Sequence, residues 1–178
     1  SVLNLAYPNY EVVLVFDDST DGTEVFLSNY PDTSGRLKII KNSRANGLAY
    51  ARNLCVYYAQ GEIVAFTDDD CSVDINWLSE IVEAFLENEN LMVVGGFTAD
   101  EHSGYSANGI FGFNMAFRKV IFDRFVFDTN FFFHKGIAHE ETDLINRIKD
   151  HNYLTGYSPR ALVKHFYSPA AYRKINQK

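Results

Sequence analysis

The sequence predicts a single α/β domain built around a mainly parallel sheet. Short apolar runs of strand length alternate with segments in which apolar residues recur at helical spacing. At 178 residues the chain suits one domain, and its share of 47% hydrophobic and 22% charged residues is ordinary for a globular protein. Two of the apolar runs end in clusters of aspartate, which places candidate ligand-binding groups at strand ends.

The expected elements follow one another in strand–helix order. Apolar runs predict strands at residues 11–16, 36–41, 62–67 and 91–96. Apolar residues at helical spacing predict helices at 22–30, 47–60 and 75–88. Farther along, we expect a mobile polar loop at 98–108, an extended segment at 109–117, a helix at 139–150 and a last strand at 161–167. This order is typical of a parallel α/β sheet.

Both aspartate clusters are expected at the same edge of the sheet. Asp17-Asp18 and Asp68-Asp69-Asp70 each follow a predicted strand, and parallel sheets bind their ligands beyond the carboxyl ends of the strands. A carboxylate at such an end can accept a hydrogen bond from a ribose hydroxyl or a base N–H, which is the role expected for Asp17-Asp18. For this pair alone, a plain turn is the simpler interpretation.

The triple aspartate indicates a cation. Carboxylates so close together repel one another, and a divalent cation relieves that repulsion. Mg²⁺ or Mn²⁺ takes oxygen ligands, commonly one or two carboxylates together with substrate phosphates. In an extended segment, alternation would direct Asp68 and Asp70 to one side and Asp69 to the other. A solvated turn that caps the following helix is the alternative interpretation.

A further pair of acids, Glu140 and Glu141, opens the helix predicted at 139–150. Glu141 precedes Leu144 by three residues and Ile145 by four, so it shares the apolar face of that helix. Partial burial there would raise the carboxyl pKa, which suits a general base. A favourable contact between an acid and the positive end of the helix dipole is the alternative.

Two basic side chains are further candidates. Arg52 lies on the helix that follows Asn46-Gly47 and could reach a phosphate, although ordinary surface polarity would also explain it. His165 alternates with apolar residues on the last strand, where a single histidine is more often structural than a ligand. Both residues are therefore weak signals when taken alone.

Charge and cysteine content restrict the function and the compartment. A formal net charge of -7 and a pI near 5.1 disfavour binding to a nucleic-acid backbone. Two cysteines, Cys55 and Cys71, make no disulfide framework and favour a reducing, cytoplasmic setting. No apolar run reaches the length of a membrane span. The aromatic residues that gather in 105–133 fit a core, an acceptor-binding surface or a membrane-facing patch.

Taken in order, the motifs resemble those of family 2 glycosyltransferases, which have the GT-A fold. The matching segments are Asp17–Thr23 (DDSTDGT), Asn46–Asn53 (NGLAYARN), Ala59–Glu62 (AQGE) followed by the triple aspartate, Gly112–Arg118 (GFNMAFR) and Glu140–Leu144 (EETDL). Each segment is moderately specific, whereas all of them in this order are highly specific. They lie within residues 8–167.

The resemblance implies a three-layer α/β/α GT-A domain that carries out an inverting sugar transfer. The donor would be a nucleotide-diphosphate sugar, the acceptor a saccharide or lipid-linked hydroxyl, and the cofactor Mg²⁺ or Mn²⁺. The residues implied for donor binding are Asp17, Asp18, Arg52, Asp68 and Asn114. Asp70 and His165 would hold the metal, and Glu141, with Glu140 beside it, would be the general base. A lipid-linked acceptor also implies a cytoplasmic location at the inner face of a membrane, with peripheral association.

The sequence departs from the family pattern at two points. Glu141 stands where the family usually has aspartate, which moves the carboxylate outward by one methylene. The family's first strand, which ends in Pro-x-Tyr-Asn, is not seen ahead of the strand at 11–16, so residues 1–178 are expected to be an N-terminally truncated GT-A domain. A non-catalytic nucleotide-sugar-binding or interaction module is therefore the alternative function. A nucleotidyltransferase would need a Gly-rich basic motif that the sequence lacks.

Overall fold

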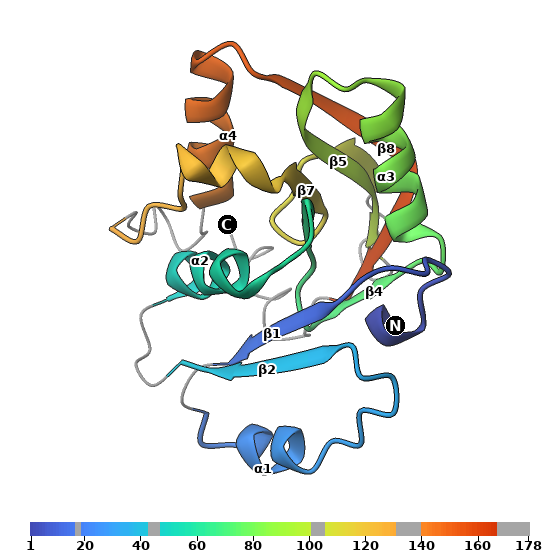
Figure 1. Ribbon diagram of the computed structural model, residues 1–178, viewed down its shortest axis with the longest axis vertical. Coiled ribbons are helices and arrows are strands. Elements are labelled where there is room, and N and C mark those ends of the chain that lie inside the picture. Colours follow the sequence, from blue (N-terminus) through green and yellow to red (C-terminus); the bar gives the residue numbers. More distant parts are fainter. Residues whose placement is uncertain (17–18, 43–46, 101–105, 131–139, 167–178) are drawn as a thin grey trace, which may run out of the picture. The chain divides into compact units, whose positions relative to one another are not determined.

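The computed structural model describes residues 1–16, 19–42, 47–100, 106–130 and 140–166 (Figure 1). Where the sequence pattern predicts one domain, the internal contacts divide the chain into two compact units. Unit 1 contains Ser1–Tyr7, Ala65–Phe117 and the chain from Leu154 onward. Unit 2 contains Pro8–Val64 and Arg118–Tyr153. None of the helices within the described ranges combines the length and the apolar character that crossing a membrane requires.

Unit 2 is built on a parallel pair of strands. Strand β1 (Val12–Phe16) pairs in parallel with β2 (Leu37–Lys41), and α1 (Thr23–Ser28) lies between them in sequence. Helix α2 (Leu48–Tyr58) packs against β1, where the Cys55 thiol approaches the Val13 carbonyl oxygen at 3.9 Å. The other helical elements of unit 2 are η2 (Lys119–Asp123) and α4 (Glu140–Asp150). Each of the apolar runs and helical periods predicted here therefore forms the expected element.

Unit 1 is built on a mixed sheet. The strand order is β3-β7-β5-β8-β4, and β6 pairs with β5. The bounds of these strands are β3 (Ile63–Phe66), β4 (Cys71–Val73), β5 (Leu91–Asp100), β6 (Ser106–Gly109), β7 (Met115–Arg118) and β8 (Leu154–His165). Helix α3 (Trp77–Glu87) packs on β5 and β8 and buries Trp77, Ile81 and Phe85. A short 3-10 helix, η1 (Val2–Asn4), opens the chain.

The α/β class with a mixed sheet is confirmed, but this sheet has more antiparallel pairing than the sequence pattern indicates. Strands β5 and β8 are parallel, whereas β6 and β7 run antiparallel to β5, and β4 runs antiparallel to β8. Parallel neighbours need a crossover of a dozen or more residues. Residues 101–105 are too few for one, so β6 returns beside β5 in the opposite direction.

The strand boundaries correct several expectations. Strand β5 runs on to Asp100 and β6 occupies Ser106–Gly109, so a large part of the loop expected at 98–108 is strand. Strand β8 begins at Leu154 instead of residue 161, and β4 was not predicted. These segments are short or rich in polar residues, and they become strands because a neighbouring strand satisfies their backbone groups.

Asn114 ties three elements of unit 1 together. Its side-chain oxygen accepts a hydrogen bond from Trp77 Nε1 on α3 at 3.0 Å. Its Nδ2 donates to the carbonyl oxygens of Phe97 on β5 (3.0 Å) and Ala161 on β8 (3.1 Å). The amide fits there because Gly96 has no side chain: a Cβ on Gly96 would overlap both the Asn114 amide and the Ala161 carbonyl. Asn114 is 1% exposed, so these hydrogen bonds are shielded from water.

We therefore expect Asn114→Ala to destabilise the fold strongly. The substitution removes the partner of the buried Trp77 N–H, of the buried Ala161 carbonyl oxygen and of the partly buried Phe97 carbonyl oxygen, at a cost of about 3 kcal/mol in the free energy of unfolding. The matched control is Asn108→Ala on the exposed side of β6, which we expect to change that free energy by less than about 0.5 kcal/mol. Urea denaturation measures both values. Equal, small effects of the two substitutions would contradict the structural role of Asn114.

Candidate functional site

The segment that follows β3 is a turn. Asp68 is half-buried, and Asp69 and Asp70 are exposed at the turn. The Cys71 N–H donates to the Asp68 carbonyl oxygen at 3.3 Å, which closes the turn and starts β4. The extended geometry that we expected for the triple aspartate is therefore wrong, and strand alternation does not decide where these side chains point.

The pairing of β4 with β8 brings the end of the chain to this turn. Cys71 lies opposite His165 in the antiparallel register, and the Phe166 N–H donates to the Asp70 carbonyl oxygen at 2.8 Å. Residues directly opposite each other in such a pair project from the same face of the sheet. Cys71 and His165 therefore share a face, and the turn adds Asp70 to them.

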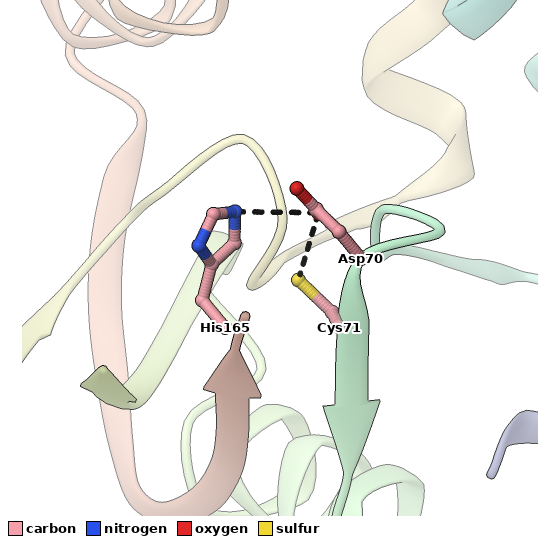
Figure 2. A group of neighbouring side chains, drawn as sticks. All are labelled: Asp70, Cys71 and His165. Carbon is pink, nitrogen blue, oxygen red and sulfur yellow. Dashed lines mark hydrogen bonds and ion pairs between the residues drawn. The ribbon is translucent and has the colours of Figure 1, made fainter. Parts of the chain in front are cut away.

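The three side chains form a compact group of potential cation ligands (Figure 2). His165 Nε2 lies 3.3 Å from Asp70 Oδ1, and Cys71 Sγ lies 3.8 Å from the same oxygen. One ligand atom from each residue lies within 4.8 Å of the other two. The His165 side chain is 6% exposed and the Asp70 side chain 47% exposed, so the group has a buried side and an open side. Carboxylate oxygen and imidazole nitrogen are both suitable ligands for Mn²⁺.

Aromatic rings hold the buried side of this group. The Phe113 ring lies against the His165 ring, with their centroids 4.4 Å apart, and Phe111 stacks on Phe113 at 5.7 Å. This packing limits the rotation of the imidazole and directs its Nε2 toward Asp70. The residues that sequence reasoning singled out as metal ligands, Asp70 and His165, are thus brought together from distant parts of the chain.

Cys71 is the member of the group that sequence reasoning missed. Burial raises the pKa of its thiol to about 12, and the charges of Asp70 and Asp68 act in the same direction. Without a cation, the thiol is therefore protonated at neutral pH. The available signal was its position immediately after Asp70, but its place opposite His165 follows from a strand that was not predicted.

A second cluster of charged groups lies within unit 2. The Arg52 guanidinium on α2 pairs with the Glu140 carboxylate, and its Nη1 lies 3.9 Å from Glu141 Oε2. The side chains of Arg52 and Glu140 are both 5% exposed, and that of Glu141 is 16% exposed. Glu141 is thus largely buried, as the helical-face argument predicts. Glu140 is buried more deeply, because α4 begins at this residue and its side chain turns toward Arg52.

This ion pair changes the interpretation of Arg52. Sequence reasoning assigned it to a donor phosphate, whereas the structure engages its guanidinium with Glu140. A charge removed from water must be paired to remain ionised, and removing one partner of such a pair usually costs about 3–5 kcal/mol. The neighbouring Asn53 joins α2 to the segment that contains Phe127. Its side-chain oxygen accepts a hydrogen bond from the Phe127 N–H (3.0 Å), and its Nδ2 donates to the Phe127 carbonyl oxygen (2.8 Å).

The other candidates differ in their surroundings. The Asn114 amide makes its hydrogen bonds within unit 1, which gives it a structural role, and the donor contact expected for it stays a prediction. Asp17 and Asp18 lie outside the described residues. Three aromatic residues of the 105–133 segment are buried in the core: Phe117, Phe125 and Phe127. These three side chains therefore do not form an acceptor-binding or membrane-facing surface.

Comparisons with known proteins identify the family and the fold of this chain. Residues 1–142 match the model of the family described as "Glycosyl transferase family 2". The chain is 31% identical over 124 residues to UDP-Glc:alpha-D-GlcNAc-diphosphoundecaprenol beta-1,3-glucosyltransferase WfgD of Escherichia coli, a match that covers 70% of this chain and 46% of that protein. It is 32% identical over 104 residues to the putative teichuronic acid biosynthesis glycosyltransferase TuaG of Bacillus subtilis (strain 168), covering 58% of this chain and 41% of that protein.

Solved structures show the same fold. The mannosyltransferase PcManGT of Pyrobaculum calidifontis, solved in complex with GDP-Man and Mn²⁺, superimposes with a TM-score of 0.77 at 20% identity, and the match covers 96% of this chain and 52% of that one. The chain spans less than half the length of the curated relatives named above. Its fold is that of the GT-A glycosyltransferases, and the chain belongs to glycosyl transferase family 2.

Proposed function

We propose that the protein transfers a sugar from a nucleotide-diphosphate sugar to an acceptor hydroxyl, with inversion at the anomeric carbon and with a divalent cation. The observation that carries the proposal is the meeting of Asp70 and His165, whose Oδ1 and Nε2 atoms lie 3.3 Å apart. Family membership supports nucleotide-sugar transfer in general. The name of one relative specifies UDP-Glc, and one structural neighbour was solved with GDP-Man and Mn²⁺.

In this proposal the donor binds at the open side of the cation group. Asp70 and His165 would hold Mg²⁺ or Mn²⁺, and Asp68 would contact the nucleoside side of the donor. Asp17 and Asp18 are further candidates for binding the nucleoside. A bound cation would offset the negative charge that builds up on the departing diphosphate. The exposed Asp70 carboxylate leaves room beside it for phosphate oxygens.

We propose Glu141 as the general base. The Arg52 guanidinium is paired with Glu140 and therefore neutralises the deeper acid, while Glu141 lies farther from it and reaches the surface. Glu141 takes the proton of the acceptor hydroxyl as the hydroxyl oxygen bonds to the anomeric carbon. The bond from that carbon to the diphosphate breaks, and the nucleoside diphosphate leaves with the electron pair. A single in-line displacement of this kind inverts the anomeric centre.

The acceptor in this proposal is a saccharide or a lipid-linked saccharide. The E. coli relative carries a diphosphoundecaprenol acceptor in its name, which supports a lipid-linked acceptor for this chain as well. The corresponding location is the cytoplasm at the inner face of a membrane, with peripheral association. The alternative function, a non-catalytic nucleotide-sugar-binding module, is favoured by the glutamate at position 141 where the family usually has aspartate.

Binding of nucleoside diphosphates tests the cation group. We expect UDP or GDP to bind in the presence of Mn²⁺ and to lose this binding in excess EDTA, as measured by isothermal titration calorimetry. Asp70→Asn should weaken Mn²⁺-dependent binding at least tenfold, because it removes a charged ligand. Asp69→Asn, at the neighbouring exposed position, is the control and should change affinity little. Equal nucleotide affinity with and without Mn²⁺ would contradict the proposal.

Turnover tests the general base. We expect Glu141→Gln to reduce release of nucleoside diphosphate from the donor sugar by at least about a hundredfold, the usual contribution of proton transfer, and to leave nucleotide binding unchanged. Glu89→Gln, at an exposed position that belongs to neither cluster, is the matched control. Full turnover in Glu141→Gln would exclude Glu141 as the base. Donor binding without turnover in the unsubstituted protein would favour the non-catalytic module.

A further inference from the structure

We propose that Cys71 is a third ligand of the cation group and makes it selective for divalent cations that accept sulfur, such as Zn²⁺ and Co²⁺, over Mg²⁺. This inference rests on the proposed cation site at Asp70 and His165. It assigns a function to a thiol that sequence reasoning used only as an indicator of the redox compartment. A thiolate is a soft ligand, so it gives the site a preference for certain cations that oxygen and nitrogen ligands alone do not give.

The positions of the ligand atoms suit one cation. Tetrahedral coordination with bonds of about 2.1 Å to oxygen or nitrogen and about 2.3 Å to sulfur separates neighbouring ligand atoms by about 3.4–3.6 Å. The separation is 3.3 Å from His165 Nε2 to Asp70 Oδ1 and 3.8 Å from Cys71 Sγ to that oxygen. The remaining pair, one nitrogen of His165 and Cys71 Sγ, lies within 4.8 Å. A cation can therefore be held after side-chain adjustments of about 1 Å or less.

The backbone fixes two of the three ligands before any cation binds. Cys71 and His165 face each other in the β4–β8 register, and the Phe113 ring packs against the imidazole. Asp70 is fixed through its backbone carbonyl, while its side chain is half exposed. Three protein ligands with one open direction is the arrangement that leaves a coordination position for a substrate oxygen.

The charges in the group also favour this role. On binding, the cation displaces the thiol proton to solvent, so Asp70 and Cys71 together supply two negative charges. Two negative charges match a divalent cation. Cys71 is not bonded to another cysteine, and the other thiol, Cys55, packs against β1 in unit 2. Mg²⁺ gains little from the thiolate because it prefers oxygen ligands.

Cobalt spectroscopy tests the sulfur ligand directly. A cobalt–thiolate bond gives a charge-transfer band in the near ultraviolet, and this readout does not depend on turnover. We expect Co²⁺ to produce the band in the full chain and in Cys55→Ser, in which Cys71 is the remaining thiol. We expect Cys71→Ser to lose the band. A band in Cys55→Ser can come only from Cys71, so the test remains valid even if the Cys71→Ser variant folds poorly.

Competition titrations test the selectivity. N/O sites already bind Co²⁺ and Zn²⁺ more tightly than Mn²⁺, so the order of affinities alone is not informative. The informative value is the change caused by Cys71→Ser: at least a tenfold loss for Zn²⁺, and less than a threefold change for Mn²⁺ and Mg²⁺. Equal losses for all of these cations would overturn the selectivity.

The two proposals fail in different ways. If Mn²⁺ and nucleotide bind but Co²⁺ gives no charge-transfer band in the full chain, Cys71 is not a ligand and the cation site at Asp70 and His165 stands. If Asp70→Asn leaves the binding of both Mn²⁺ and Co²⁺ unchanged, the cation site itself is wrong, and the inference on Cys71 fails with it. A band that persists in Cys71→Ser and disappears in Cys55→Ser would assign the sulfur to Cys55.

Discussion

The antiparallel pairing of β4 with β8 is the constraint on which the candidate cation site depends. This ladder places Cys71 opposite His165 and holds the Asp70 backbone through the Phe166 N–H. A shift of one residue in the register would turn His165 to the other face of the sheet and separate it from Asp70. The site therefore requires the correct strand pairing before any property of its side chains matters.

The interior supports this pairing through buried polar groups as well as apolar packing. Asn114 joins β8 to β5 and to α3, so the strand that carries His165 is fixed on its other side. In unit 2, the buried ion pair of Arg52 and Glu140 likewise joins two elements, α2 and α4, through polar side chains. Buried polar groups contribute modestly when they are satisfied and cost much when one partner is lost, so they specify one arrangement among several apolar alternatives.

Local patterns predicted the elements well, because periodicity reports which residues face a core. They predicted β1, β2, α2, α3 and α4 to within a few residues. Register is not a local property, so the sequence alone did not reveal β4, the partners of Asn114 or the position of Cys71. Asp70 and His165 were singled out through resemblance to a family, and the structure supplies their proximity. The helical-face argument identified Glu141 as largely buried, but it did not anticipate that Glu140 would take Arg52 as its partner.

The central claim is that Asp70 and His165 hold the cation on which a nucleotide-sugar donor binds. Anomalous X-ray diffraction at the manganese absorption edge, from crystals grown with Mn²⁺ and a nucleoside diphosphate, tests it most directly. We predict an anomalous peak within bonding distance of Asp70 Oδ1 and His165 Nε2, with the diphosphate beside it. A nucleotide bound with its manganese peak away from both side chains would contradict the assignment.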